Sequence, residues 1–276
     1  MAKIDRLGWA AGFAIESYGA RVGVRTNDPG VLDELAVRFP PGWKPARVEV
    51  VDRLYSLFAA ADAPRARGLR RFNLLYGDAG RLTRTHDLSE ALEAFESDLQ
   101  LYVAATARRR LFVHAGVVGW RGRAVVLPGR SFAGKTTLVA ALVREGATYY
   151  SDEYAVFDRA GRVHPYARPL GMREGASGRQ TKLAVEALDG VRGERALPVG
   201  LVVVSEYRAG ARLRARRLSQ GQGLLAMLAN TVSARRQPEV ALGVLQKVSA
   251  RAPVYKCARG EADAAAASIL KLLEES

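Results

Sequence analysis

The stretch AVVLPGRSFAGKT, residues 124–136, decides the fold of this chain. Its second part fits the phosphate-binding pattern G-x-x-x-x-G-K-[ST] through Gly129, Gly134, Lys135 and Thr136. A glycine-rich turn lets several backbone N–H groups converge on one small anion, and the next helix adds the positive end of its dipole. The pattern therefore predicts a site for the phosphates of a nucleotide triphosphate.

The sequence on both sides of the loop supports this interpretation. Residues 124–127 form a short apolar run typical of a buried strand, and residues 137–145 carry apolar side chains at helical spacing. Gly146 then marks the end of the helix. A plain glycine turn with a solvated lysine is the alternative, but strand, loop and helix stand in the order that a phosphate loop requires.

The pattern also predicts individual contacts and two cofactors, ATP and Mg²⁺. Lys135 is expected to reach the β- and γ-phosphates, and the Thr136 hydroxyl to bind Mg²⁺. The candidate nucleotide-binding residues are Gly129, Arg130, Ser131, Phe132, Ala133, Gly134, Lys135, Thr136 and Thr137.

Phosphoryl transfer further needs an acid on the metal side and a base or positioning group for the nucleophile. Two places in the sequence could supply carboxylates. Asp152 and Glu153 come at the end of the strand that follows the loop helix, and Glu206 follows the apolar run of residues 201–204. A charged strand end at a turn would explain either place without any catalytic role.

His114 is the third kind of candidate, on the strand expected to pair with the loop strand. A histidine there could lie near the phosphates or orient a carboxylate, or it could be an ordinary core histidine. His164 and Arg168 are weaker candidates.

The segment VHAGVVGWRGRAVVLPGRSFAGKTTLVAALVREGATYYSDEYAVFD resembles the catalytic core of the HPr kinase/phosphorylase family. The likeness covers about residues 111–166, is looser to about residue 260 and is absent before residue 108. The stretches PVGLVVVSEYRAGARL and LLAMLANTV are similar to a divergent branch, some of whose members accompany ribosomally made peptide pathways.

The resemblance implies a fold related to phosphoenolpyruvate carboxykinase: an α/β, mixed-sheet kinase core. It implies that Lys135 binds phosphate, Thr136 and Glu153 serve Mg²⁺, Asp152 is the base and His114 supports the site. The chain has Asp-Glu for the family's Asp-Asp, Phe132 where glycine is common, and no Glu-Ile-Arg-Gly segment between residues 170 and 200. That segment assists phosphorolysis, so the likeness implies a kinase more than a phosphorylase.

The expected function is thus an ATP- and Mg²⁺-dependent kinase acting on a serine-type hydroxyl of a peptide or protein. Three alternatives stay open: a small-molecule kinase, a nucleotide-binding regulatory protein with little transfer activity, and an ordinary P-loop ATPase that uses Glu206. Relatives are often hexamers, which leaves a homo-oligomer open.

Composition narrows the partners. The chain has 276 residues and a formal net charge of +14, mostly from arginine. This charge favours either a solvated basic surface or an anionic partner, which could be nucleic acid, an acidic protein or peptide, or a phosphorylated ligand. No nucleic-acid-binding signature accompanies the charge. No apolar run approaches the ~18 residues of a membrane span, the N-terminus does not resemble a signal peptide, and Cys257 is the single cysteine. A cytoplasmic protein is expected.

The pattern of predicted elements changes near residue 108, which indicates a domain boundary there. Residues 1–108 are expected to form a small α+β domain with a strand hairpin over residues 10–26 and a long helix that Asp87 caps, with Glu90 completing a capping box. Residues 109–276 are expected to form the kinase domain. Its later helices are expected at residues 224–230, 238–250 and 262–273, with a strand at residues 254–257.

Overall fold

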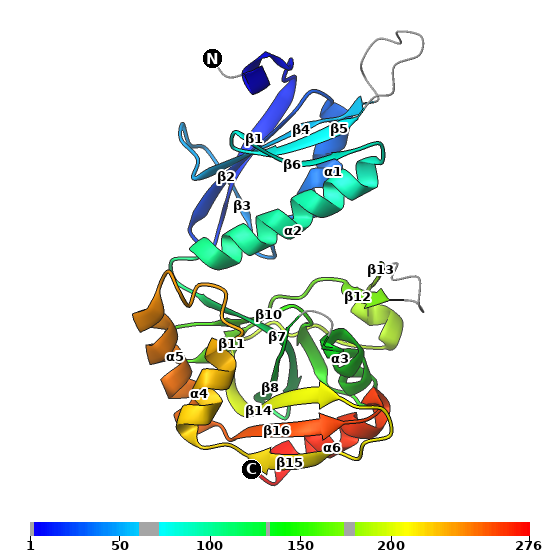
Figure 1. Cartoon of the computed structure of the whole chain (residues 1–276), viewed down its shortest axis with the longest axis vertical. Helices are drawn as coiled ribbons and strands as arrows, with labels where there is room; N and C mark the ends of the chain where they lie inside the picture. Colours follow the sequence, from blue (N-terminus) through cyan, green and yellow to red (C-terminus); the bar gives the residue numbers. More distant parts are fainter. Residues whose placement is uncertain (1–2, 61–71, 131–132, 174–179) are drawn as a thin grey trace. The chain divides into compact units, whose positions relative to one another are not determined.

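The computed structural model describes residues 3–60, 72–130, 133–173 and 180–276. The chain divides into two compact units, Met1–Arg108 and Arg109–Ser276 (Figure 1). Each unit combines helices with a sheet of parallel and antiparallel strands, so the predicted α/β class with mixed sheets is confirmed.

The described part of the first unit forms one sheet in the order β3-β1-β2-β4-β5-β6. Its strands are antiparallel except for the parallel pair β2–β4. Alternate strand residues pack against α2 and α1 in one core. The elements are β1 (Ala11–Ser17), β2 (Ala20–Thr26), α1 (Leu32–Ala36), β3 (Lys44–Ala46), β4 (Arg53–Phe58), β5 (Asn73–Gly77), β6 (Gly80–Thr85) and α2 (Leu88–Thr106).

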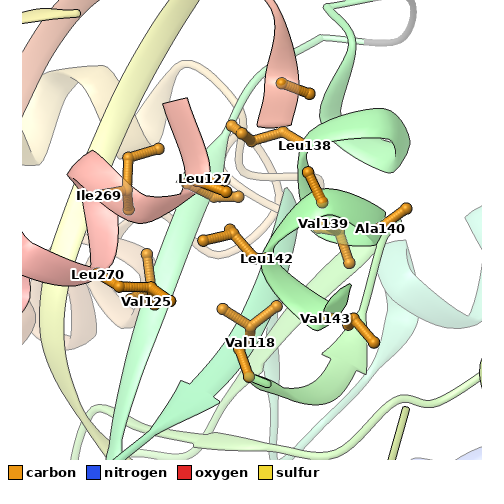
Figure 2. Packing of buried hydrophobic residues seen from close by; sticks show 14 of the residues in the cluster. Val118, Val125, Leu127, Leu138, Val139, Ala140, Leu142, Val143, Ile269 and Leu270 are labelled. Carbon is orange, nitrogen blue, oxygen red and sulfur yellow. The ribbon is translucent and has the colours of Figure 1, made fainter. Parts of the chain in front are cut away.

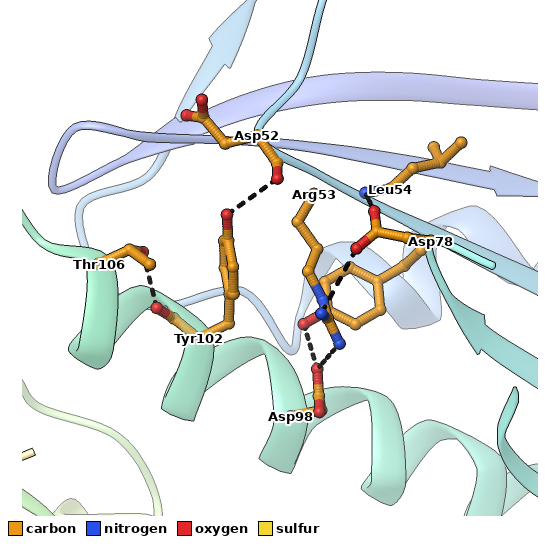
Figure 3. A network of polar contacts seen from close by, with 8 residues as sticks. Asp52, Arg53, Leu54, Asp78, Asp98, Tyr102 and Thr106 are labelled. Atoms are coloured by element: carbon orange, nitrogen blue, oxygen red, sulfur yellow. Dashed lines mark hydrogen bonds and ion pairs between the residues drawn. The ribbon is translucent and has the colours of Figure 1, made fainter. Parts of the chain in front are cut away.

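A polar network joins α2 to β4 in this unit (Figure 3). Asp98 accepts hydrogen bonds from Arg53 Nη2 at 2.8 Å and from Tyr55 Oη at 2.6 Å. Asp78 accepts one from the Leu54 N–H at 2.9 Å. Burial raises the pKa of Tyr55, so its hydroxyl stays a donor. A buried phenol needs a partner, and this one fixes α2 on the sheet.

In the second unit the described strands form an eight-stranded sheet in the order β11-β10-β7-β8-β14-β16-β15, with β9 also paired to β7. β14 runs parallel to β8 and β16, and the other pairs are antiparallel. The strands are β7 (Leu111–Trp120), β8 (Arg123–Pro128), β9 (Thr148–Ser151), β10 (Tyr154–Phe157), β11 (Arg162–His164), β14 (Leu197–Tyr207), β15 (Arg214–Arg217) and β16 (Val254–Arg259). A separate hairpin consists of β12 (Leu170–Arg173) and β13 (Gln180–Leu183).

Helices cover both faces of this sheet. They are α3 (Lys135–Arg144), α4 (Gln220–Leu228), α5 (Pro238–Arg251) and α6 (Ala262–Glu274). Val125 and Leu127 of β8 pack with α3 and α6 on one face (Figure 2), whereas Ala124 and Val126 pack with α4 and α5 on the other. A strand buried on both faces carries apolar side chains at successive positions, which explains the run before the loop.

The predicted elements lie close to the observed ones. The hairpin, the long helix, the strand–loop–helix order and the last three helices are confirmed. The structure adds β3, β6, the hairpin β12–β13 and β15, which the sequence did not indicate. β15 is a strand of four exposed residues at the sheet edge, so it lacks the apolar alternation that marks a half-buried strand.

The predicted capping box at the start of α2 is wrong in detail. Asp87 does cap the helix, accepting from the Ser89 N–H at 2.8 Å. Its own N–H donates to Thr85 Oγ1 at 3.1 Å, and the same hydroxyl donates to Glu90. Asp87 and Glu90 are therefore connected through the Thr85 hydroxyl and not by the direct hydrogen bond that a capping box requires. A capping box is present instead between Ser219 and Gln222 of α4.

Candidate functional site

The hairpin of β7 and β8 sets where the phosphate loop begins. Its turn consists of Arg121 and Gly122, both with positive φ (46° and 77°), as a two-residue hairpin turn requires. β8 then returns along β7, and the Gly129 N–H donates to the His114 carbonyl at 3.1 Å. The first residue of the loop is thus anchored beside His114.

The loop enters α3 at Gly134, and glycine is required there for two reasons. The residue is the N-cap of α3 in the left-handed region, with φ +73°. A Cβ atom would also lie 2.6 Å from Nη2 of Arg259. Of the candidate loop residues, Ser131 and Phe132 lie outside the described residues.

Two of the other loop residues, Ala133 and Lys135, donate hydrogen bonds to the backbone carbonyl of Arg130. Arg130 O accepts from the Ala133 N–H at 3.2 Å and from Lys135 Nζ at 2.9 Å. The Lys135 side chain is half-buried, and its ammonium points back to the loop through this hydrogen bond. A phosphate oxygen at the loop could replace the Arg130 carbonyl as its partner. Thr137, in the first turn of α3, is exposed.

Lys135 lies close to both predicted carboxylates. Burial lowers the pKa of its ammonium, and the negative charges of Glu153 and Asp152 oppose that shift. The predicted phosphate loop and the turn after β9 are in contact through the hydrogen bond from Thr136 to Asp152, so these charges act over a short range.

Asp152 is held by three donors. Its Oδ2 accepts from Thr136 Oγ1 at 3.0 Å and from the Gly171 N–H at 3.3 Å, and Tyr149 Oη lies 3.0 Å from its Oδ1. Burial, followed by the neighbouring charge of Asp152, raises the pKa of Tyr149, so this hydroxyl stays protonated. The carboxylate is thereby fixed against the hydroxyl that the sequence assigned to Mg²⁺.

The end of α3 explains how the chain reaches that position. Gly146 has φ +90°, its N–H donates to Val143 O at 2.9 Å, and the Ala147 N–H donates to Leu142 O at 3.0 Å. This glycine stop reverses the chain. β9 then runs antiparallel to β7 and brings Asp152 back to the first turn of the helix.

His114 is half-buried near the same lysine. Its ring packs on the ring of Tyr154, with centroids 4.8 Å apart. Burial and then the positive charge of Lys135 lower the pKa of the imidazole. A neutral imidazole beside an ammonium can accept or pass on a proton, but it does not add positive charge to a phosphate site.

The remaining candidates lie apart from this arrangement. Glu206 is exposed on β14 and forms an ion pair with Arg208 at 3.2 Å. His164 Nε2 lies 3.0 Å from Asp158 Oδ2 at the β10–β11 turn. The Arg168 carbonyl accepts from Tyr149 Oη at 2.7 Å, and the charge of its side chain acts on Tyr154.

Sequence reasoning missed two residues of the site, Tyr149 and Arg259. Tyr149 could have been found, because it lies three positions before Asp152 on a predicted strand. Arg259 donates to the Gly134 carbonyl at 3.0 Å from a strand at the far end of the chain. No local pattern links it to the loop.

The donor set fits Mg²⁺ with a nucleotide. Among the described residues no group of three or more His, Cys, Asp or Glu side chains could hold a metal on its own. Mg²⁺ at nucleotide sites commonly takes one or two carboxylates, waters and phosphate oxygens, so a self-sufficient protein cage is not required. Thr136 and Asp152 could supply the protein ligands.

Comparison with models of known protein families gave no match, and comparison with curated proteins gave none either. No helix in the described ranges has the length and apolar character needed to cross a membrane.

Proposed function

We propose that the chain is an ATP- and Mg²⁺-dependent kinase that transfers the γ-phosphate to a serine-type hydroxyl of a peptide or protein. One observation carries this proposal: the hydrogen bond between Thr136 Oγ1 and Asp152 Oδ2, beside Lys135. A phosphate loop whose Ser/Thr hydroxyl adjoins an aspartate is the arrangement that holds a metal nucleotide in phosphoryl-transfer proteins. The proposed core is of the HPr kinase type.

The contacts favour different roles for the two carboxylates from those first expected. Asp152 is fixed against Thr136, which suits the metal side. Glu153 is exposed on the same turn and acts on Lys135, which suits a group that meets an incoming hydroxyl. We therefore assign Thr136 and Asp152 to Mg²⁺ and Glu153 to the base.

The chemistry follows from these positions. The acceptor oxygen attacks the γ-phosphorus of ATP, the bond to the ADP oxygen breaks, and the hydroxyl proton passes to Glu153. Lys135 and the N-terminus of α3 stabilise the charge on the phosphate oxygens. Bound Mg²⁺ would neutralise further phosphate charge. His114, neutral beside Lys135, supports the lysine without adding charge.

The acceptor is inferred from the surface. The chain carries a net charge of +14, and Arg214, Arg216 and Arg217 are exposed on the edge strand β15. A basic surface attracts acidic ligands at a distance. We propose a peptide or protein acceptor with acidic residues near its serine, which includes a ribosomally made precursor peptide.

The alternatives make different predictions. An ordinary P-loop ATPase would use Glu206, which is exposed and paired with Arg208. A regulatory protein would bind nucleotide without transfer, and a small-molecule kinase would ignore peptides.

Incubation of the full chain with γ-labelled ATP, Mg²⁺ and a panel of serine peptides tests the proposal. We expect label on the peptide hydroxyl, and none when Mg²⁺ is removed by chelation. Nucleotide binding without label on any hydroxyl would support the regulatory protein. Release of free phosphate that Glu206→Gln abolishes would support the ATPase.

A further inference from the structure

Arg259 is a buried cation at the end of β16, with 2% of its surface exposed. In the described part of the chain, its guanidinium donates to two backbone carbonyls, Gly134 O at 3.0 Å and Gly260 O at 3.1 Å. Its Nε has no hydrogen-bond partner there. No carboxylate of the described residues pairs with it. Tyr207 Oη donates to the nearby carboxylate of Glu261 at 2.7 Å.

This position is unfavourable for an isolated cation. The guanidinium lies against the N-cap of α3, where the helix dipole is already positive, and Lys135 adds another charge in the next position. Buried charges in proteins are normally paired, because removing an ion from water costs several kcal/mol. Two carbonyl contacts, the Tyr207 ring 5.7 Å from the guanidinium and the negative charge of Glu261 compensate this charge in part. An anion at the same loop would compensate the rest.

We propose that Arg259 is a second cation of the phosphate site, supplied from β16 and directed at the phosphate oxygens of the bound nucleotide. The inference rests on the proposed function and adds a residue to it. A guanidinium offers several donors in a fixed plane, so it can hold the Gly134 carbonyl and still present N–H groups to an oxyanion. Arg259 would thus both fix the loop conformation at Gly134 and neutralise part of the charge of the bound phosphates.

Calorimetric titration of the full chain with MgADP and with inorganic pyrophosphate tests this role. Arg259→Gln keeps a donor for Gly134 and removes the charge, whereas Arg259→Lys keeps the charge. We expect R259Q to lose about 10-fold or more in affinity for both ligands, as charge-assisted contacts do, and R259K to lose clearly less than R259Q, because it keeps the charge but not the planar fork. Lys256→Met is the matched control, because Lys256 is exposed on the same strand, and it should change affinity less than about twofold.

Two further measurements separate charge from packing. The affinity of wild type should fall more steeply with salt than that of R259Q, because one screened contact is missing. In the wild-type protein the Nε–H signal of Arg259, assigned by its loss in R259K, should shift when pyrophosphate is added. This readout does not depend on how any neutral variant folds.

The outcomes separate the two proposals. Wild-type affinity in R259Q, or an unmoved Nε–H signal at saturating pyrophosphate, would overturn the role of Arg259 and leave the kinase proposal standing. Equal losses in R259Q and R259K would assign Arg259 to packing alone and overturn it too. Failure of the wild-type chain to bind either ligand would instead remove the proposed function.

Discussion

Thr136 Oγ1 and Asp152 Oδ2 lie 3.0 Å apart and join the first turn of α3 to the turn between β9 and β10. The same carboxylate is held by Tyr149 and by the Gly171 N–H. Three segments of the second unit therefore meet at one aspartate. A change at any of them should therefore alter the surroundings of Asp152 and of the proposed nucleotide site.

Lys135→Ala should weaken the affinity for MgATP by about 10- to 100-fold, because a charged contact to phosphate is worth roughly 1.5–3 kcal/mol. The side chain is half-buried, and within the described ranges its hydrogen bond is to the Arg130 carbonyl, so the fold should persist. Titration with a non-hydrolysable ATP analogue measures the loss. Lys271→Ala, on the exposed face of α6, is the control. Unchanged affinity in K135A would remove the phosphate-loop assignment.

Asp152→Asn and Glu153→Gln should fail in different ways. D152N should lose most of the Mg²⁺ dependence of nucleotide binding, since its carboxylate adjoins Thr136. E153Q should bind MgATP almost as well as wild type and transfer phosphate ~10²–10⁴-fold more slowly, as loss of a general base does. Binding and single-turnover transfer, measured separately, decide this. The reverse pattern would return the role of base to Asp152, as the resemblance to the HPr kinase family implied.

Gly134→Ala should destabilise the second unit by about 1–2 kcal/mol from the left-handed backbone alone. The new Cβ must also displace Arg259, so nucleotide affinity should fall with stability. Gly221→Ala in α4 is the matched control. No neighbour lies within 4 Å of its Cβ, and alanine should leave stability equal or raise it by up to about 1 kcal/mol. Equal urea midpoints for the two variants would contradict the prediction.

The lowered pKa of His114 gives a pH dependence with a definite sign. The unfolded chain takes up a proton near pH 6.5, whereas the folded imidazole resists it to a lower pH. Folding stability contributed by this group is therefore present above pH 6.5 and is lost as the pH falls through the folded pKa. In the His114→Gln variant, the thermal unfolding temperature should therefore decrease less than in wild type as the pH is lowered from 7.5 to below 6.5. If the unfolding temperature of the variant decreases with falling pH as much as that of wild type, other titrating groups cause the decrease.

The acceptor prediction concerns salt and sequence together. Acidic serine peptides should be phosphorylated more efficiently than neutral or basic ones, mainly through a lower KM. The advantage should shrink as salt rises, because the Debye length falls from ~10 Å at 0.1 M to ~3 Å at 1 M. Steady-state rates at constant MgATP measure both effects. Equal use of the three peptide classes would make the arginines an ordinary solvated surface.

Local patterns in the sequence predicted most of the second unit. The helix expected at residues 137–145 is observed as Lys135–Arg144, because apolar spacing, the loop and Gly146 all mark it. Strand β15 escaped notice, since four exposed residues at a sheet edge carry no burial pattern. β9 and β10 are separated by a turn at Asp152 and Glu153. Hydrogen bonds from the Glu153 and Tyr154 N–H groups to Ser151 Oγ form this turn. The sequence did not predict it, because strand-forming residues stand on both sides.

The site was predictable only where its residues are neighbours in sequence. Asp152 and Glu153 come at the end of the strand that follows the loop helix, so chain order alone suggested that they lie near the loop, but not that Asp152 contacts Thr136. Arg259 lies 125 positions from Gly134. Its place depends on β16 pairing with β14, which in turn pairs with β8, and no pattern within one segment reveals such a sheet order.

The two ends of the phosphate loop are each tied to a different strand of one sheet: Gly129 to β7 through His114, and Gly134 to β16 through Arg259. The conformational entropy of these end residues is therefore lost when the sheet forms, before any nucleotide arrives. For a phosphate ligand bound at this loop, as proposed, the affinity is then not diminished by ordering these residues again at the moment of binding. Loss of either hydrogen bond should thus make the entropy of association less favourable, in addition to the effect of any phosphate contact that is lost with it.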